Sequence, residues 1–265
     1  MTPATEVHIP GSADEAVSLF GDGATTTVLG GGTIVIPEIT SGRLSPGRVL
    51  LLSHAGLDGV RIEGETVTIG ATTPVGTLSE LADQVPALAA CALNVADYEV
   101  RGQGTVGGNI CAGHGHEAPR GDLQGALLAL DARVRSAGSD GERTEPLEDF
   151  LAHQTGRLVL DISFERPAAS AFSVLEYPHT HEYTVLAVTG ARAGDGTIRL
   201  AATGLASPGA RLRSAEAAAS DKEVAGAASV ADVTFADDAI ASAWYREQTL
   251  PVLVRRVLTQ LEESA

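Results

Sequence analysis

The sequence predicts an α+β protein with a strand-rich N-terminal part and a smaller C-terminal part that combines a sheet with helices. Short β-branched segments alternate with segments of helical apolar spacing, which is typical of this fold class. Near the C-terminus, the Gly-Asp-Gly turn at 194–196 joins two apolar runs and predicts a hairpin. The chain has 265 residues, enough for one large or two modest domains with a sizeable core.

The N-terminal part is expected to alternate strands and short helices. Strands are predicted at 6–9, 25–29 and 48–52, and a hairpin at 59–70. Helices are predicted at 12–20, 34–39, 74–85 and 86–93. Ser12 and Glu15 form a capping box for the first helix, while Thr33 and Thr73 stand where they could cap the second and third. Pro37 limits how far the second helix can extend.

The rest of the chain divides at residues 166–171, so the expected domains are 1–166 and 167–265. Before this boundary the pattern predicts a helix at 123–130, strands at 132–136 and 157–164, and a surface turn at 138–144. Beyond it the pattern predicts strands at 183–192 and 197–205 and helices at 211–219 and 238–261. The last helix is expected to break at Pro251.

Charge and composition exclude several classes of function. The chain has 18 Lys and Arg against 34 Asp and Glu, a net charge of −16, which argues against nucleic-acid and anionic-membrane partners. No secretory leader or membrane-length apolar run is evident, so we expect a cytoplasmic protein. Cys91 and Cys111 are too few for a disulfide framework or a complete iron–sulfur cluster, and each is expected to pack as a small apolar group.

Two glycine-rich loops are the most informative local feature. One is Gly30–Gly32, directly after a predicted strand, and the other contains Gly102, Gly104, Gly107 and Gly108. Glycines permit positive φ angles and close approach of a ligand to the main chain, and consecutive N–H groups in such a loop can bind a phosphate. Simple turn geometry would explain either loop alone, whereas the two loops together with a third block, which begins at Asp122, favour a cofactor site.

The second loop also matches the Gly-x-Gly-x-x-Gly pattern of dinucleotide-binding folds. In those folds the loop opens a helix within a βαβ unit, whereas the segment after Gly108 contains further glycines and a proline and lacks a helical apolar stripe. No lysine follows either loop, which excludes a Walker phosphate-binding motif. Neither standard nucleotide motif therefore accounts for the loops.

Three blocks together resemble a known family. They are Gly30-Gly-Gly-Thr33 with Pro37, then Arg101-x-x-Gly-Thr-Val-Gly-Gly-Asn109, then Asp122-Leu with the helix that follows. Their order and spacing resemble the FAD-binding (medium) subunit of the molybdenum hydroxylases, the xanthine dehydrogenase and carbon monoxide dehydrogenase family. The C-terminal part resembles this family more loosely, through Tyr245-Arg246 and 251–256. The resemblance implies a PCMH-like FAD-binding domain of two subdomains, followed by a flavoprotein C-terminal domain with a small antiparallel sheet and helices.

The resemblance also implies a cofactor and roles for individual residues. Both loops would hold the FAD pyrophosphate through main-chain N–H groups, with added hydroxyl donors from Thr33 and Thr105. Asn109 would fix the second loop, and Asp122 would hydrogen-bond the ribose or the adenine side. The expected FAD-binding residues are Gly30, Gly31, Gly32, Thr33, Ile34, Thr105, Gly107, Gly108, Asn109 and Asp122. No catalytic acid, base, nucleophile or metal ligand is expected in this chain.

The implied function is electron transfer within a larger complex. FAD would receive electrons from 2Fe–2S clusters of a small subunit, after hydroxylation at a molybdenum cofactor of a large subunit, and pass them to NAD⁺, oxygen or another acceptor. One alternative is a stand-alone FAD-dependent oxidoreductase without molybdenum partners. A second alternative is a scaffold that has lost FAD. The substrate, the acceptor and the stoichiometry stay open.

Two histidine-containing segments depart from the family pattern. The segment with His114, His116 and Glu117 is longer than usual, and is interpreted as a solvent loop, a gate beside the cofactor or, as a minor alternative, a metal site. The segment 175–184 lacks the basic residue that the family carries near the flavin. Either His179 or His181 substitutes for it, or the contact is absent and both are surface histidines without this role.

Overall fold

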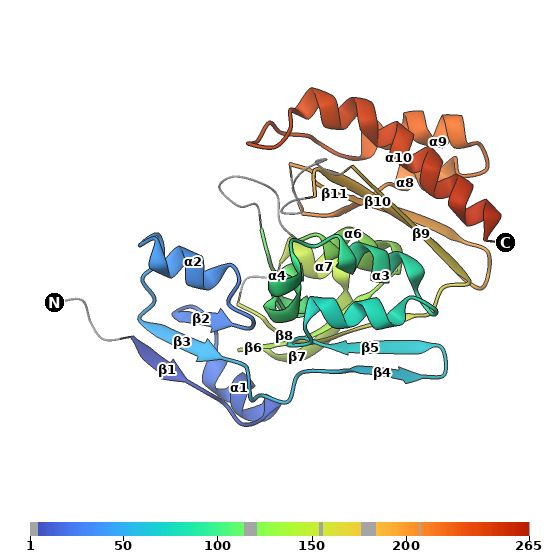
Figure 1. Ribbon diagram of the computed structural model, residues 1–265. Coiled ribbons are helices and arrows are strands. Elements are labelled where there is room, and N and C mark those ends of the chain that lie inside the picture. Colours follow the sequence, from blue (N-terminus) through green and yellow to red (C-terminus); the bar gives the residue numbers. More distant parts are fainter. Residues whose placement is uncertain (1–4, 114–120, 154–155, 176–183, 207, 265) are drawn as a thin grey trace.

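The computed structural model describes residues 5–113, 121–153, 156–175, 184–206 and 208–264. Its larger part is layered: a five-stranded sheet, a layer of helices, a four-stranded sheet and an outer layer of helices follow one another from bottom to top of Figure 1. A separate three-stranded sheet with its own helices lies to the N-terminal side. The fold is α+β, which confirms the predicted class. Among the described residues, no helix combines the length and apolar character needed to span a membrane.

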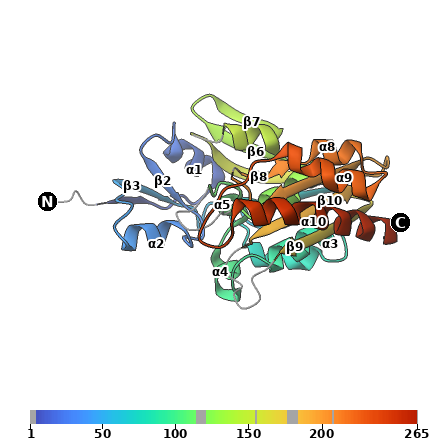
Figure 2. The same ribbon diagram turned by 90° about the horizontal axis from the view of Figure 1, so that it is seen from above.

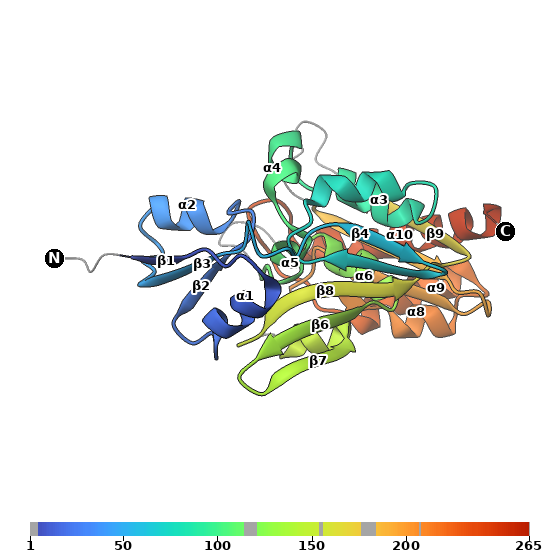
Figure 3. The same cartoon turned by 90° about the horizontal axis from the view of Figure 1, so that it is seen from below.

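The N-terminal unit is a parallel sheet in the order β1-β3-β2. Its strands are β1 (Glu6–His8), β2 (Thr26–Leu29) and β3 (Arg48–Leu51), and its helices are α1 (Ala13–Phe20) and α2 (Val35–Thr40). The two helices cover opposite faces of this sheet (Figures 1 and 3). Ser12 caps α1 as predicted, since its hydroxyl accepts from the Glu15 N–H. Ala16 and Phe20 of α1 pack against Leu50.

The five-stranded sheet is antiparallel, in the order β4-β5-β8-β6-β7, as Figure 3 shows from below. Its strands are β4 (Val60–Glu63), β5 (Thr66–Gly70), β6 (Arg133–Gly138), β7 (Gly141–Pro146) and β8 (Leu158–Glu165). The predicted surface turn at 138–144 is wrong in part, because β7 pairs with β6 along its whole length. This edge strand is polar and carries no alternating apolar pattern, so the sequence does not reveal it.

Helices cover the inner face of this sheet and are shared with the next one. They are η1 (Val75–Leu81), α3 (Pro86–Leu93), α4 (Tyr98–Gln103), α5 (Val106–Ile110), α6 (Leu123–Ala129) and α7 (Leu147–Ala152). The main core joins side chains of these helices other than α4, which has no buried residue, and side chains of β5, β6 and β8 to Ala191 and Ala201 of the four-stranded sheet. The helical layer thus packs between two sheets, which explains why α6 is buried along its whole length.

The C-terminal sheet has the strand order β12-β11-β10-β9. It is antiparallel, as predicted. Its strands are β9 (Ala169–Leu175), β10 (Leu186–Arg192), β11 (Ile198–Thr203) and β12 (Ala210–Arg211), and the hairpin at 194–196 joins β10 to β11. The outer helices are α8 (Arg213–Ala217), α9 (Lys222–Ala228), η2 (Ser229–Asp232) and α10 (Ala243–Glu263). Figures 1 and 2 show α10 lying across this sheet. The division into domains 1–166 and 167–265 stays a prediction.

Three local predictions are wrong. The helix α10 does not break at Pro251 but continues to Glu263, because Leu250, Val254 and the apolar residues that follow hold it against the sheet. Thr73 does not cap a helix: its hydroxyl donates to the Gly59 carbonyl, and the segment 75–81 is a 3₁₀ helix. The residue at the N-cap of α2 is Ile34 rather than Thr33, and no side chain caps that helix.

Candidate functional site

A cavity of about 950 Å³ lies where the N-terminal unit meets the five-stranded sheet and its helices. Its walls come from the loop after β2, the end of β5, the segments around α4 and α5, the start of α6 and the start of β8. This volume is at the upper end of the range for pockets that enclose small organic ligands. All ten predicted site residues line it: Gly30, Gly31, Gly32, Thr33, Ile34, Thr105, Gly107, Gly108, Asn109 and Asp122.

The first glycine loop makes direct main-chain contact with the second. A Cβ atom on Gly31 would lie 1.7 Å from the carbonyl oxygen of Gln103, and one on Gly30 would lie 2.7 Å from Thr105 Oγ1. Gly32 has a φ of +76°, a left-handed conformation that favours glycine. At Gly30 and Gly31 the second loop therefore leaves no room for a side chain. At Gly32 the backbone conformation disfavours one.

Five successive N–H groups of the first loop are available to a ligand. Within the part of the chain that the structure describes, no hydrogen bond has the main-chain N–H of any residue from Gly30 to Ile34 as its donor. These groups belong to residues that line the cavity. Unpaired N–H groups are costly when a site is closed from water, so a ligand with several acceptor oxygens suits this loop.

The second glycine loop differs from its prediction. Gly102, Gly104, Gly107 and Gly108 do not have positive φ angles, and the loop contains the short helices α4 and α5. The N–H of Gly107 donates to the Ala71 carbonyl and that of Gly104 to Val100. A Cβ on Gly107 would lie 2.9 Å from the Ala71 oxygen. Gly107 thus serves close packing on the end of β5, and its N–H and that of Gly104 are already used within the protein.

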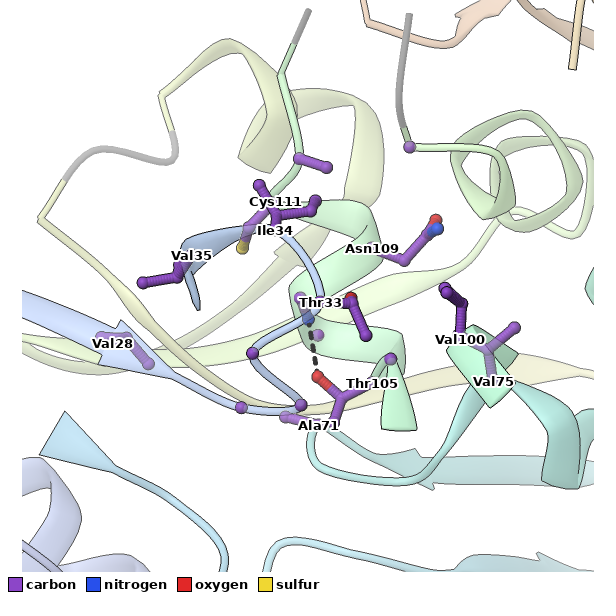
Figure 4. A pocket seen from close by; sticks show the side chains of 18 of the residues that line it. Val28, Thr33, Ile34, Val35, Ala71, Val75, Val100, Thr105, Asn109 and Cys111 are labelled. Atoms are coloured by element: carbon purple, nitrogen blue, oxygen red, sulfur yellow. Dashed lines mark hydrogen bonds between the residues drawn. The ribbon is translucent and has the colours of Figure 1, made fainter. Parts of the chain in front are cut away.

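The polar side chains of the site gather where the first loop meets α5 (Figure 4). Thr105 Oγ1 accepts from the Gly108 N–H at 3.2 Å, the dashed contact in Figure 4, and so caps α5. Asn109 Oδ1 accepts from the Leu123 N–H at 2.9 Å, which ties α5 to the start of α6. Thr33 extends from the first loop toward this group (Figure 4). The hydroxyl hydrogen of Thr105 remains available to donate to a ligand.

Asp122 stands at the N-cap position of α6 and is half-buried at the cavity wall. Its side chain does not cap the helix. Its main-chain carbonyl accepts a weak hydrogen bond from Cys91 Sγ at 3.4 Å. Burial first, and then the charge of Asp122, raise the pKa of the Cys91 thiol, so Cys91 stays protonated as a packing residue.

Several further cavity residues were not predicted. The Asp97 carboxylate caps α4 by accepting from the Val100 N–H at 2.7 Å. Arg43 makes a bidentate ion pair with Glu38, at 2.7 and 3.0 Å. The guanidinium of Arg157 donates to the hydroxyl and carbonyl oxygens of Ser136. These residues come from segments without glycine motifs, so only their position in space reveals them.

A strained turn forms another part of the wall. Ala96 has a φ of +43°, which is unusual for a residue other than glycine. The guanidinium of Arg101 donates to the carbonyl oxygens of Val95 at 3.0 Å and Ala96 at 2.6 Å. Arg101, the first residue of the second sequence block, therefore holds this turn in place from within α4.

Cys111 also lines the cavity (Figure 4). Although Cys111 is exposed as a residue, burial of its sulfur raises the pKa of this thiol to about 12, so the thiolate is scarce at neutral pH. Neither cysteine forms a disulfide. His114, His116, Glu117, His179 and His181 lie outside the described residues. Among the described residues no group of three or more His, Cys, Asp or Glu is arranged to bind a metal.

Comparison with protein families gives a match over residues 3–164 to the FAD binding domain in molybdopterin dehydrogenase. The chain belongs to this family. The match includes both glycine loops and Asp122, and it confirms the predicted resemblance to FAD-binding subunits of molybdenum hydroxylases. It also confirms FAD, the cofactor in the family's description, as the expected cofactor.

This chain is also similar in sequence to individual members of the family. The carbon monoxide dehydrogenase medium chain of Hydrogenophaga pseudoflava is 34% identical over 154 residues, which are 56% of this chain and 52% of that protein. The chain thus matches about half the length of this relative. The nicotine 6-hydroxylase medium subunit of Paenarthrobacter nicotinovorans is 24% identical, with 97% of each chain covered.

A solved structure of carbon monoxide dehydrogenase from Hydrogenophaga pseudoflava contains a chain of the same fold. The TM-score is 0.88 at 26% identity, and the superposition covers 100% of this chain and 99% of that one. The likeness of fold therefore extends over the C-terminal sheet and helices, beyond residues 3–164 that the family match covers.

Proposed function

We propose that this chain is the FAD-binding, electron-transferring subunit of a molybdenum hydroxylase-type oxidoreductase. The observation that carries the proposal is the loop Gly30–Ile34, whose five N–H groups find no acceptor among the described residues and border a cavity of about 950 Å³. A glycine cradle of this kind suits the pyrophosphate of a dinucleotide. The cavity, the family match and the threonine hydroxyl groups on the cavity wall support FAD as the ligand.

The proposed roles of the site residues follow from their contacts. The N–H groups of Gly30–Ile34 would bind the pyrophosphate oxygens, with the Thr33 and Thr105 hydroxyls as additional donors. Gly107 would let α5 pack on the end of β5 at the cavity wall, Gly108 would let it lie close to Thr105, and Asn109 would hold α5 against α6. The Asp122 carboxylate at the cavity wall would accept from the ribose or the adenine side. These roles concern binding and orientation, not acid–base or nucleophilic catalysis.

Bound FAD would supply the electron-carrying chemistry, while the protein supplies position and electrostatics. One relative is named as the medium chain of a dehydrogenase and another as the medium subunit of a hydroxylase, which supports partner chains for this protein too. In the proposed complex a small subunit with 2Fe–2S clusters delivers electrons, and a large subunit with the molybdenum cofactor hydroxylates the substrate. NAD⁺, oxygen or another acceptor then receives the electrons. The proposed compartment is the cytoplasm.

The test begins with the absorption spectrum of the full chain purified alone, with identification of the nucleotide released on denaturation. Mass spectrometry of proteins that co-purify from the native host is the second measurement. FAD together with iron–sulfur and molybdopterin chains supports the proposal. FAD without such partners favours a stand-alone oxidoreductase, and absence of flavin binding even with excess FAD would leave only the scaffold.

A further inference from the structure

Gln124 is a fully buried polar residue next to the cavity, although it does not line it. Its side chain is 0% exposed on the second position of α6. Nε2 donates to the carbonyl oxygens of Ile110 at 2.8 Å and Ala112 at 3.1 Å, and Oε1 accepts from the Gly209 N–H at 2.8 Å. Both donor hydrogens are used, and the oxygen has a partner. An amide so completely satisfied in a core holds its partners in one arrangement.

The space around Gln124 is closed by glycines. Gly121 has a φ of +90°, and a Cβ there would lie 2.5 Å from Gln124 Nε2. A Cβ on Gly209 would lie 2.8 Å from Gln124 Cβ, and one on Gly125 would lie 3.1 Å from Thr203 Cγ2. The start of α6 is therefore pressed against the C-terminal sheet with no room for side chains between them.

The three partners of Gln124 lie in two parts of the molecule. Ile110 ends α5, and Ala112 belongs to the stretch of cavity wall that also contains Asn109 and Cys111. Gly209 directly precedes β12, the edge strand of the C-terminal sheet. One amide thus links the cavity wall to a segment 85 residues away.

We propose that Gln124 is a positioning residue. By bonding Gly209 next to the C-terminal sheet, it holds residues 109–112 of the cavity wall in the position that binds FAD. The inference rests on the proposed function, because it assigns this wall to the FAD site. Without the amide, the Ile110 and Ala112 carbonyls lose their donor and the wall can relax away from the ligand. A substitution at Gly209, which lies outside the cavity, is then expected to alter the affinity for FAD.

The experiment compares two Gly→Ala variants of the full chain. Gly209→Ala forces a methyl group against Gln124, whereas Gly194→Ala, in the same C-terminal sheet region, meets no atom within 4 Å. We measure the Kd for FAD by flavin fluorescence, the visible spectrum of bound flavin and the Tm of each variant. Gly209→Ala is expected to raise the Kd about tenfold and Gly194→Ala less than about twofold.

Variants of Gln124 test the other side of the link. Gln124→Met removes all three hydrogen bonds at similar volume, and Gln124→Glu keeps the acceptor for Gly209 but loses the two donated bonds. Each is expected to raise the Kd about tenfold and to change the visible spectrum of the flavin at saturating FAD. Adding Gly209→Ala to Gln124→Met is expected to weaken FAD binding little further, because both changes act on one link.

Ser229→Ala is the control for general loss of stability, since it removes a buried hydrogen bond to the Gly226 carbonyl far along the C-terminal part. It is expected to lower the Tm without changing the flavin spectrum. The inference is overturned if Gly209→Ala binds FAD as Gly194→Ala does, or if Ser229→Ala loses FAD as the Gln124 variants do. Either result leaves the proposed function intact as long as the wild-type chain binds FAD. A wild-type chain that binds no FAD overturns both.

Discussion

The main chain of Gly31 lies against the carbonyl oxygen of Gln103, so closely that a Cβ on Gly31 would stand 1.7 Å from that oxygen. The two glycine loops, far apart in the sequence, therefore form one structure. Gly30 makes the same kind of contact with Thr105 Oγ1, at 2.7 Å. The relative position of the loops depends on the absence of side chains at both positions.

Gly31→Ala is expected to separate the loops. The methyl group would force main-chain shifts, which we expect to reduce the free energy of unfolding by about 1–3 kcal/mol and FAD affinity about 100-fold. Gly47→Ala is the matched control, because a Cβ there meets no atom within 4 Å. Chemical denaturation and FAD titration measure the two effects. Equal FAD affinity in both variants would contradict the contact between the loops.

Thr105 is expected to act through its hydroxyl. Thr105→Val keeps the shape but removes the acceptor for the Gly108 N–H, so we expect a loss of about 1 kcal/mol in stability. Loss of the hydroxyl donor should also weaken FAD binding about tenfold. Thr105→Ser retains both functions and should stay close to wild type in FAD titrations. If Ser and Val behave alike, the hydroxyl has neither role.

The Cys111 thiol is expected to react slowly despite its position at the cavity. Its raised pKa, about 12, means that the thiol stays protonated at pH 8 and that the thiolate increases as the pH rises toward that value. At pH 8 the thiolate fraction should be on the order of 1,000-fold below that of an ordinary cysteine. Alkylation by iodoacetamide, followed by mass spectrometry from pH 7 to 10, should accelerate about tenfold per pH unit.

A Cys111→Ser variant provides the control for that measurement, because only the buried Cys91 then remains. Rapid alkylation of Cys111 at pH 7 with a plateau below pH 9 would contradict the raised pKa.

Arg246 is expected to be essential for the stability of the C-terminal part. Its buried guanidinium donates to the carbonyl oxygens of Val185, Ala236 and Ala241 and pairs with Asp238 at 2.6 Å. Arg246→Leu leaves these acceptors unpaired, so we expect the free energy of unfolding to fall by about 3–5 kcal/mol. Thermal unfolding measures this decrease. Arg256→Leu, an exposed arginine of the same helix, should change stability by less than about 0.5 kcal/mol.

Much of the fold was predictable because many of its elements carry local signals. The apolar strands β2, β3, β5 and β8 and the glycine hairpin between β10 and β11 lie where the sequence predicts them. The edge strand β7 and the helices α4 and α5 were not predicted, since they lack an apolar period. Pro251 was predicted to end a helix, but packing against the C-terminal sheet outweighs the local effect of one proline.

Residue type and short-range order are enough to predict the α+β class, the positions of the two glycine loops and ten of the residues that line the cavity. The role of each loop depends on contacts between distant segments. The Gly107 N–H of the second loop meets the Ala71 carbonyl, while the N–H groups of Gly30–Ile34 meet no acceptor among the described residues. The contacts that make this difference, and those of Gln124, join segments distant in the chain, and residue order alone does not specify which distant groups meet.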